Sequence, residues 1–251
     1  MTFSEEVAWV TGSSTGIGRA VAEALAREGR RVAVHYNASE GEARKVVEAI
    51  SSSGGEAMLV GGDVSSAGEV DRMVGEIRRR YGRLDVLVNN AGSLIERRGL
   101  AEMTEELWDR VMDVNLKSVF LCSRAVLPMM KRQGAGRIIN LTSVAARNGG
   151  GPGSVAYATA KGGVSTLTRA MAKELVSENV LVNGVAPGVI TTPFHDRFTP
   201  PEVRENLKNA IPIGREGTPE ETAAVVAFLA SPAASYLVGE IIEVNGGQLM
   251  S

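Results

Sequence analysis

Short apolar runs alternate with amphipathic stretches along most of the chain. Runs such as VAWVT at 7–11 and RVAVHY at 31–36 are apolar at neighbouring positions, which is typical of strands buried on both faces. The predicted strands cover residues 7–11, 31–36, 57–61, 85–90, 137–142, 180–185 and 240–246.

The stretches between these runs place apolar residues at helical spacing. In IGRAVAEALAR, for example, Ile17, Val21 and Leu25 fall on one side of a helix that Gly29 ends. The predicted helices cover residues 17–27, 40–52, 67–81, 105–132, 154–177 and 220–229. Strands that alternate with helices predict an α/β protein with a parallel sheet covered on both faces. No linker interrupts the pattern, so we expect residues 1–251 to form a single domain.

The segment 187–219 is the least regular part of the chain, because it is rich in proline and carries mixed charge. It is either a plain surface loop or a mobile lid over a binding site. Long irregular segments inside compact domains are usually functional or disordered, so we favour a substrate lid near 190–215.

Composition and charge exclude several classes of partner. The chain of 251 residues has 27 Lys and Arg against 29 Asp and Glu, so no basic excess indicates nucleic-acid binding. No apolar run approaches the roughly 18 residues that a membrane span needs. The first residues are acidic where a secretion signal would be basic. The single cysteine, Cys122, cannot form an internal disulfide, and we therefore expect a cytoplasmic protein.

Glycine is abundant, with 29 residues, and the sequence TGSSTGIG at 11–18 stands between a predicted strand and a predicted helix. Gly12, Gly16 and Gly18 allow the backbone to approach a pyrophosphate, which the free N–H groups of a helix N-terminus attract. The spacing differs from the Gly-x-Gly-x-x-Gly fingerprint. The alternative is a glycine-rich turn that serves only tight packing.

Two later segments also follow predicted strands, at the edge where ligands bind to open parallel sheets. GDVSS offers Asp63 and Val64 for an adenine ring, and NNAG offers Asn89 for a ribose. Alternatively, Asn89 and Asn90 satisfy backbone groups of their own loop.

The sequence YATAK places Tyr157 and Lys161 four positions apart on one helix face. A nearby ammonium favours the phenolate and lowers the pKa of the tyrosine, which makes it a general acid or base. Ser143 follows a strand and is placed to hydrogen-bond a substrate oxygen. Each feature alone is weak, but their order after the glycine-rich loop is specific.

Together these motifs resemble the short-chain dehydrogenase/reductase family over essentially the whole chain. The matching pieces are TGSSTGIG, NNAG, the Asn of DVNLKSVF, the Ser of NLTS, YATAK, PGVITT and EVNGG. The resemblance implies a single-domain, Rossmann-type doubly wound sheet of about seven strands with helices on both faces. It also implies a homotetramer, and the predicted helix 105–132 has apolar residues on more than one face, as a partner contact would need.

The resemblance assigns roles to residues of the predicted site. Tyr157 exchanges the proton, Ser143 orients the carbonyl or alcohol, Lys161 binds the nicotinamide ribose, and Asn115 supports a relay water. Pro187, Gly188, Ile190 and Thr192 line the nicotinamide. The candidate cofactor contacts are Gly12, Ser14, Thr15, Gly16, Ile17, Gly18, Tyr36, Asn37, Ser39, Asp63, Val64, Asn89, Ala91, Gly92, Tyr157, Lys161, Pro187, Gly188, Ile190 and Thr192.

The expected reaction transfers a hydride between a nicotinamide and a carbonyl or secondary alcohol. No acid follows the second strand until Glu40, so nothing repels a 2′-phosphate, and Asn37 and Ser39 can bind it. This favours NADP(H). NAD(H) stays possible because no basic residue follows the strand either. We expect His35 to pack at the edge of this pocket without a catalytic role.

The sequence leaves three interpretations of the function open. Arg97, Arg147 and His195 favour a polar sugar-derived or 2-oxo acid substrate, unless they only solvate loops. A 3-oxoacyl-(acyl-carrier-protein) reductase shares every motif and is the alternative. A non-catalytic nucleotide-binding sensor is the third. His195 has no second histidine or cysteine near it at ligand spacing, so we predict no metal site.

Overall fold

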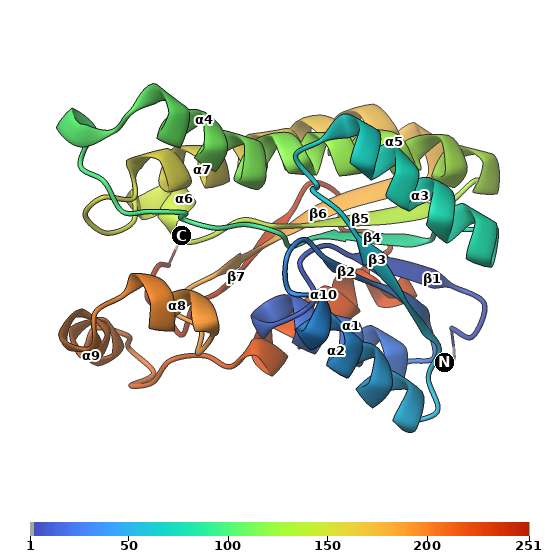
Figure 1. Cartoon of the computed structure of the whole chain (residues 1–251), viewed down its shortest axis with the longest axis horizontal. Coiled ribbons are helices and arrows are strands. Elements are labelled where there is room, and N and C mark those ends of the chain that lie inside the picture. The colour runs from blue at the N-terminus through green and yellow to red at the C-terminus, as the bar shows by residue number, and fades with distance from the viewer. Residues whose placement is uncertain (1–2, 251) are drawn as a thin grey trace.

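The computed structural model describes residues 3–250, and a parallel sheet of seven strands runs through its centre (Figure 1). The strand order is β3-β2-β1-β4-β5-β6-β7. The strands are β1 (Val7–Val10), β2 (Arg31–Tyr36), β3 (Ala57–Gly61), β4 (Val86–Asn89), β5 (Gly136–Leu141), β6 (Val180–Pro187) and β7 (Ile241–Val244). The predicted α/β class, with its doubly wound sheet, is confirmed.

Helices cover both faces of the sheet, as the strands buried on both sides require. One layer consists of α1 (Gly16–Arg27), α2 (Glu40–Ser52) and α10 (Pro219–Leu229). The other consists of α3 (Ala67–Tyr81), α4 (Glu105–Met112), α5 (Ser118–Gln133), α6 (Ala145–Asn148) and α7 (Val155–Leu175). Each layer forms its own apolar core with one face of the sheet. Further single helical turns are Leu100–Glu102, Val176–Glu178 and Pro232–Ala234.

The chain reverses its direction of winding at β1, which pairs with both β2 and β4. The connections on the two sides of this point leave in opposite directions, so a crevice opens beyond the carboxyl ends of these strands. We call this side of the sheet the carboxyl edge and the opposite side the amino edge. All segments that the sequence marks for the cofactor follow carboxyl ends.

The predicted helix 105–132 is a continuous helical run with an irregular turn. A π-helical turn, Asp113–Lys117, joins α4 to α5 and contains Asn115, which is fully buried. Single π-turns inside α-helices are frequent at functional sites, because the extra residue shifts side chains relative to the regular helix.

The segment predicted to be irregular is partly helical, and here the expectation of a loop is wrong. It forms α8 (Pro193–Phe198) and α9 (Pro201–Asn209), at the lower left of Figure 1. Two of its prolines, Pro193 and Pro201, occupy the first turns of these helices, where the missing N–H is not needed. They begin helices rather than interrupt them.

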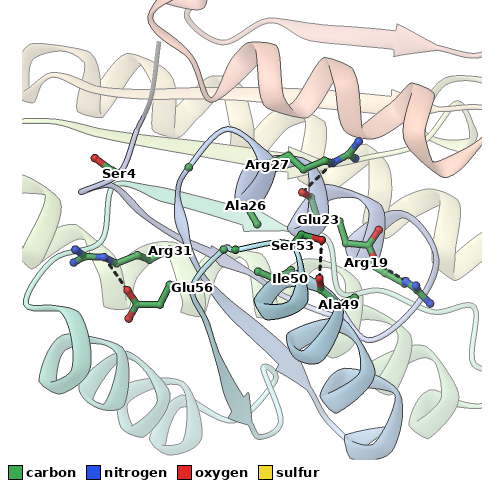
Figure 2. A pocket seen from close by; sticks show the side chains of 13 residues that line it. Ser4, Arg19, Glu23, Ala26, Arg27, Arg31, Ala49, Ile50, Ser53 and Glu56 are labelled. Atoms are coloured by element: carbon green, nitrogen blue, oxygen red, sulfur yellow. Dashed lines mark hydrogen bonds and ion pairs between the residues drawn. The ribbon is translucent and has the colours of Figure 1, made fainter.

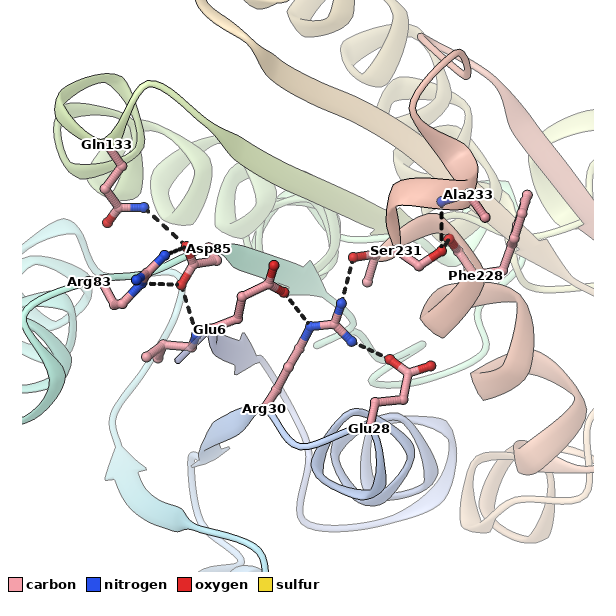
Figure 3. Close-up of polar contacts among 11 residues, drawn as sticks. Glu6, Glu28, Arg30, Arg83, Asp85, Gln133, Phe228, Ser231 and Ala233 are labelled. Atoms are coloured by element: carbon pink, nitrogen blue, oxygen red, sulfur yellow. Dashed lines mark hydrogen bonds and ion pairs between the residues drawn. The ribbon is translucent and has the colours of Figure 1, made fainter. Parts of the chain in front are cut away.

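Ion pairs and charged hydrogen bonds hold the chain together at the amino edge (Figure 3). The buried Arg30 donates from Nε to Glu6 over 2.8 Å, donates from Nη2 to the Ala230 carbonyl over 2.8 Å, and pairs with Glu28. Asp85, just before β4, accepts a hydrogen bond of 2.8 Å from the first backbone N–H of β1. These contacts connect α1, α10 and the strand starts.

Candidate active site

The loop between β1 and α1 has a backbone conformation that depends on its glycines. Gly12 and Gly16 have φ angles of +63° and +57°, which L side chains rarely adopt. A Cβ atom on Gly18 would lie 2.3 Å from the Gly12 carbonyl oxygen, so only glycine allows this packing. The backbone N–H groups of the first turn of α1 therefore lie at the carboxyl edge. The loop fits the diphosphate of a dinucleotide, and Ser14, Thr15 and Ile17 are at least partly exposed around it.

The loop after β4 is tied to this glycine-rich loop. Thr11 Oγ1 accepts hydrogen bonds from the backbone N–H groups of Asn90 (2.9 Å) and Ala91 (3.0 Å). The Asn90 side chain donates in return to the carbonyls of Thr11 (2.9 Å) and Gly12 (3.0 Å). Asn90 therefore satisfies loop backbone, as the alternative interpretation of NNAG had it.

The side chain of Asn89 points into the protein, not toward a ribose. Its Nδ2 donates to Asn140 Oδ1 over 2.8 Å and to Ser123 Oγ over 3.1 Å, and the residue is 3% exposed. Asn140 continues the chain of hydrogen bonds to Thr168 on α7 over 2.9 Å. The ribose contact predicted for this side chain is therefore not supported, because a buried amide has to satisfy its polar atoms within the core.

The ends of β2 and β3 carry the residues that the sequence analysis expects around the adenosine of the cofactor. Asn37 and Ser39 are exposed and Tyr36 is half-buried. Asp63 Oδ1 accepts from the backbone N–H and the hydroxyl of Ser65, at 2.8 and 2.7 Å, so this carboxylate also fixes its own turn. The neighbouring Val64 is buried.

The predicted catalytic side chains converge from three elements. Tyr157 and Lys161 lie on α7 and Ser143 follows β5. The Ser143 hydroxyl lies close enough to that of Tyr157 to influence its pKa. Lys161 Nζ lies 5.7 Å from the centre of the Tyr157 ring. Gly92 lies between Lys161 and Asn115. A Cβ on this glycine would lie 2.7 Å from Asn115 Oδ1 and 3.3 Å from Lys161 Nζ.

The pKa of Tyr157 departs from the sequence-based expectation. Burial raises it to about 12, and the hydrogen bond with Ser143 opposes this less strongly. The predicted lowering by Lys161 is wrong for this structure, because Lys161 Nζ donates instead to the carbonyl of Leu141 over 2.7 Å. Burial also lowers the pKa of Lys161 to about 8. Both groups are thus protonated near neutral pH.

Asn115 holds the loop that follows NNAG. Its Nδ2 donates to the carbonyls of Ser93 (2.7 Å) and Val111 (2.8 Å), and its Oδ1 accepts from the Ser93 N–H over 3.1 Å. The buried side chain thus fixes the backbone beside Gly92, opposite Lys161.

The stretch after β6 closes over the glycine-rich loop. Thr192 is 8% exposed, and a Cβ on Gly16 would lie 3.4 Å from its Cγ2. Pro187 accepts a hydrogen bond from the backbone of the loop after β5, and Ile190 is buried. Gly188 packs so closely that a Cβ would lie 2.8 Å from Asn245. The structure therefore brings this segment beside the predicted cofactor loop.

The charged residues chosen for a polar substrate are engaged with the protein itself. Arg97 donates from Nε to the Phe198 carbonyl (2.7 Å) and from Nη1 to the Pro152 carbonyl (2.9 Å). Arg147 is 3.4 Å from the carboxylate of Glu243. His195, the third of these residues, lies in α8, and its Nδ1 is 3.0 Å from the hydroxyl oxygen of Thr199.

Phe194 lies within the lid expected near 190–215, but the sequence analysis did not select it individually. Its ring centre is 5.7 Å from that of Tyr157, and the rings of His195 and Phe198 lie 5.4 and 5.1 Å from it. The signal was the aromatic pair Phe194 and Phe198, four positions apart, which form one face of a helix once α8 is recognised.

Two hollows in the surface of the described residues bear on the position of the site. One of about 490 Å³ lies between residues 95–97 and 196–201, beside α8. Another of about 640 Å³ lies between α1 and α2 near the amino edge (Figure 2). There Arg19 pairs with Glu23 and Arg31 with Glu56, while Arg27 donates to the Glu23 carbonyl. Tyr157 is not among the residues that line this hollow. Among residues 3–250, no group of three or more His, Cys, Asp or Glu side chains is placed to hold a metal ion.

Comparison with known proteins identifies the family. Residues 12–248 match the family described as enoyl-(acyl carrier protein) reductase. The chain belongs to the short-chain dehydrogenase/reductase family. It is 44% identical over 243 residues to 3-oxoacyl-(acyl-carrier-protein) reductase FabG of Staphylococcus aureus, covering 97% of this chain and 98% of that protein.

Other relatives of this short-chain dehydrogenase/reductase agree. A 3-oxoacyl-(acyl-carrier-protein) reductase of Synechocystis is 45% identical, covering 98% of this chain and 97% of that protein. A crystal structure provisionally described as a gluconate dehydrogenase of Agrobacterium tumefaciens superposes with a TM-score of 0.93 at 33% identity, covering 100% and 98% of the two chains. The protein is therefore an oxidoreductase that acts on carbonyl or alcohol substrates with a nicotinamide cofactor. No helix in the described part of the chain is long and apolar enough to cross a membrane.

Proposed function

We propose that the protein uses NADPH to reduce the 3-oxo group of an acyl thioester, as in 3-oxoacyl-(acyl-carrier-protein) reduction. The observation that carries this proposal is the aromatic wall that Phe194 and Phe198 form beside Tyr157. Such a wall suits an acyl chain, whereas hydroxyl groups of a sugar acid would lose their hydrogen bonds against it. Arg97 and Arg147 hydrogen-bond or pair with the protein itself, which removes the main support for a polar substrate.

The relatives support the same substrate class. Three relatives that match nearly the whole chain, from Staphylococcus aureus, Synechocystis and Thermotoga maritima, are named 3-oxoacyl-(acyl-carrier-protein) reductases at 44%, 45% and 40% identity. We therefore favour a 3-oxoacyl thioester, which was our alternative from the sequence, over the sugar-derived acid.

The proposed catalytic residues supply a proton and hold the carbonyl. Bound NADPH supplies the hydride to the carbonyl carbon. Tyr157 is protonated at neutral pH, since its pKa is about 12, and donates its proton to the carbonyl oxygen. Ser143 donates a second hydrogen bond to that oxygen. Lys161, whose Nζ donates to the Leu141 carbonyl over 2.7 Å, would bind the nicotinamide ribose. Asn115 acts by holding the backbone beside Gly92.

The preference for NADP(H) over NAD(H) rests on the surface at the ends of β2 and β3. Asn37 and Ser39 are exposed there, and Glu40 is paired with Arg44. Arg72 reaches the same place from α3 and donates to the Gly61 carbonyl over 2.6 Å. Arg72 also pairs with Glu76 over 2.7 Å, so the preference rests on the lack of a repelling carboxylate at Asn37 and Ser39 and not on a free positive charge.

The test is the oxidation of NADPH and NADH, followed at 340 nm, with acetoacetyl thioesters of coenzyme A and of acyl carrier protein. A gluconate-derived 2-oxo acid and simple diketones complete the panel. We expect turnover of the thioesters with NADPH at least tenfold faster than with NADH. Turnover of the sugar-derived acid alone would overturn the proposed substrate.

The sugar acid stays as a second candidate because of one observation. The solved structure that covers the whole chain at a TM-score of 0.93 carries a gluconate dehydrogenase description. In that case the hollow beside Arg97 would receive the carboxylate, and Arg97→Ala would raise the KM for the acid without changing that for NADPH.

We further propose a single domain in which α8 and α9 form the substrate lid. The lid is fastened by Arg204, which donates to Glu216 over 2.6 and 2.8 Å, and by the contact of Arg97 with the Phe198 carbonyl. We also propose a cytoplasmic homotetramer, supported by the buried free thiol of Cys122 and by the exposed Phe120 on α5. Light scattering should give a mass near four subunits.

A further inference from the structure

We propose that His35 is a positioning residue that shapes the pyrophosphate-binding loop, and that its neutral imidazole makes cofactor affinity depend on pH. The inference rests on the proposed cofactor site but not on the substrate. His35 is 1% exposed near the end of β2, and the chain has only one other histidine. Its side chain lies behind the crevice and touches no reacting group that the mechanism uses.

Both ring nitrogens of His35 are hydrogen-bonded to backbone. The N–H of Gly12 donates to Nδ1 over 2.8 Å, and Nε2 lies 2.9 Å from the carbonyl oxygen of Gly62. Since Nδ1 accepts, the single ring proton of the neutral form sits on Nε2 and is donated to Gly62. One tautomer thus satisfies both contacts.

These contacts join two segments of the cofactor site. Gly12 is the first glycine of the loop and holds a φ of +63°, while Gly62 directly precedes Asp63. The backbone adds two more bonds to the same loop: Ser13 N–H donates to the His35 carbonyl (2.9 Å), and His35 N–H donates to Ser13 Oγ (2.8 Å). The imidazole therefore sets the distance between the loop after β1 and the turn after β3.

Protonation would break this arrangement. An imidazolium carries hydrogen on both nitrogens, so Nδ1–H would face the N–H of Gly12, donor against donor. The loop would have to move away from the conformation that receives the pyrophosphate. Cofactor binding and protonation of His35 therefore oppose each other, and each weakens the other by the same factor.

The groups around His35 determine the pH at which its imidazole becomes protonated. Burial, the largest effect, lowers the pKa of His35 below its usual 6.5, while the bond to Gly62 and the carboxylate of Asp63 act in the opposite direction. On the β1 side the neighbour is the uncharged ring of Trp9, edge-on at 6.4 Å. From α3, Glu69 and Arg72 approach Gly62 with opposite charges. Affinity is therefore expected to be full above pH 6.5 and to fall below it.

The experiment compares His35→Asn with the wild type by calorimetric titration with NADP⁺ between pH 8 and 5. Asparagine places Oδ1 where Nδ1 was, so it still accepts from Gly12 but cannot be protonated. The 2′-phosphate, with a second pKa of about 6, titrates equally in both proteins. We expect the wild-type Kd to rise between pH 7.5 and pH 5 by a factor at least threefold greater than that of His35→Asn, whatever the affinity of the variant at pH 7.5.

Two further variants test the same point. His35→Phe keeps the ring but removes the acceptor, and we expect its Kd at pH 7.5 to rise about fivefold or more, as the loss of a buried hydrogen bond implies. If it does not fold, the pH profile of His35→Asn still decides. His195→Asn, the control at the other histidine, should keep the wild-type pH dependence of NADP⁺ binding. Parallel profiles of wild type and His35→Asn would overturn the inference, whereas the absence of any NADP⁺ binding would overturn the cofactor proposal itself.

Discussion

The two edges of the one sheet are held together by different chemistry. At the amino edge, full charges make the contacts: the buried Arg30 binds Glu6 and Glu28. Around the glycine-rich loop at the carboxyl edge, neutral groups make the contacts, as in the amide of Asn90 and the imidazole of His35. Carboxylates beside a bound pyrophosphate would repel it, so neutral donors and acceptors suit the task of holding this loop in shape.

The largest expected effect separates chemistry from structure at the carboxyl edge. Tyr157→Phe keeps the ring against Phe194 but removes the proton donor. We expect kcat to fall by about 10²–10⁴-fold, with unchanged NADPH affinity and melting temperature, measured at 340 nm and by fluorescence titration. A variant that turned over at the wild-type rate would remove Tyr157 from the mechanism.

The next effect belongs to the amino edge. Arg30→Met leaves two carboxylates without their cation and the Ala230 carbonyl without its donor. We expect it to lower the free energy of unfolding by about 2–4 kcal/mol, measured in urea, while kcat of the folded enzyme stays the same. Arg31→Met is the matched control, since its pair with Glu56 is partly exposed and contributes less than about 1 kcal/mol. Equal losses in the two variants would contradict the special role of Arg30.

A smaller effect tests whether charge is disfavoured at the carboxyl edge. Asn37→Asp puts a carboxylate where we place the 2′-phosphate, and repulsion of about 1 kcal/mol or more should lower the NADPH to NADH ratio of kcat/KM by about tenfold. Asn37→Ser, which adds no charge, is the control. An unchanged ratio in the aspartate variant would place the phosphate elsewhere.

The smallest effect concerns pH. Because burial lowers the pKa of Lys161 to about 8, the lysine loses its charge progressively above that pH. The kcat/KM for reduction should therefore be level below pH 7, halve near pH 8 and fall further in alkali, while Tyr157 stays protonated throughout. Lys173→Arg, an exposed change on the same helix, should leave the profile unaltered. A rate that stayed level to pH 9.5 would show that the charge of Lys161 is not needed.

The fold could be predicted from the sequence because the patterns that indicate it are local. Buried strands, helical spacing and the glycine-rich loop each occupy a few consecutive residues, and the motifs that follow strand ends share one edge of any parallel sheet. Local signals gave a wrong prediction for residues 193–209, because prolines that begin helices cannot be distinguished by residue type from prolines in a loop.

The side-chain roles were less accessible because they depend on distant partners. The amide of Asn89 is committed to Asn140, 51 positions away, and Arg97 is bound to the Phe198 carbonyl, 101 positions away. The pKa of Tyr157 is governed by burial, which only the assembled structure reveals. Residue type and spacing could locate these groups at the site but could not assign their hydrogen bonds.

One consequence concerns the kinetic order of binding. Thr192 lies against Gly16, and two residues later Phe194 lies against Tyr157, so a single short segment covers both halves of the crevice. If α8 acts as the proposed lid, its displacement would open the proposed dinucleotide and acyl sites together, and its return would bury the molecule that arrived first beneath the second. We therefore expect sequential kinetics with NADPH as the leading reactant. NADP⁺ should then inhibit competitively against NADPH and in a mixed pattern against the ketone.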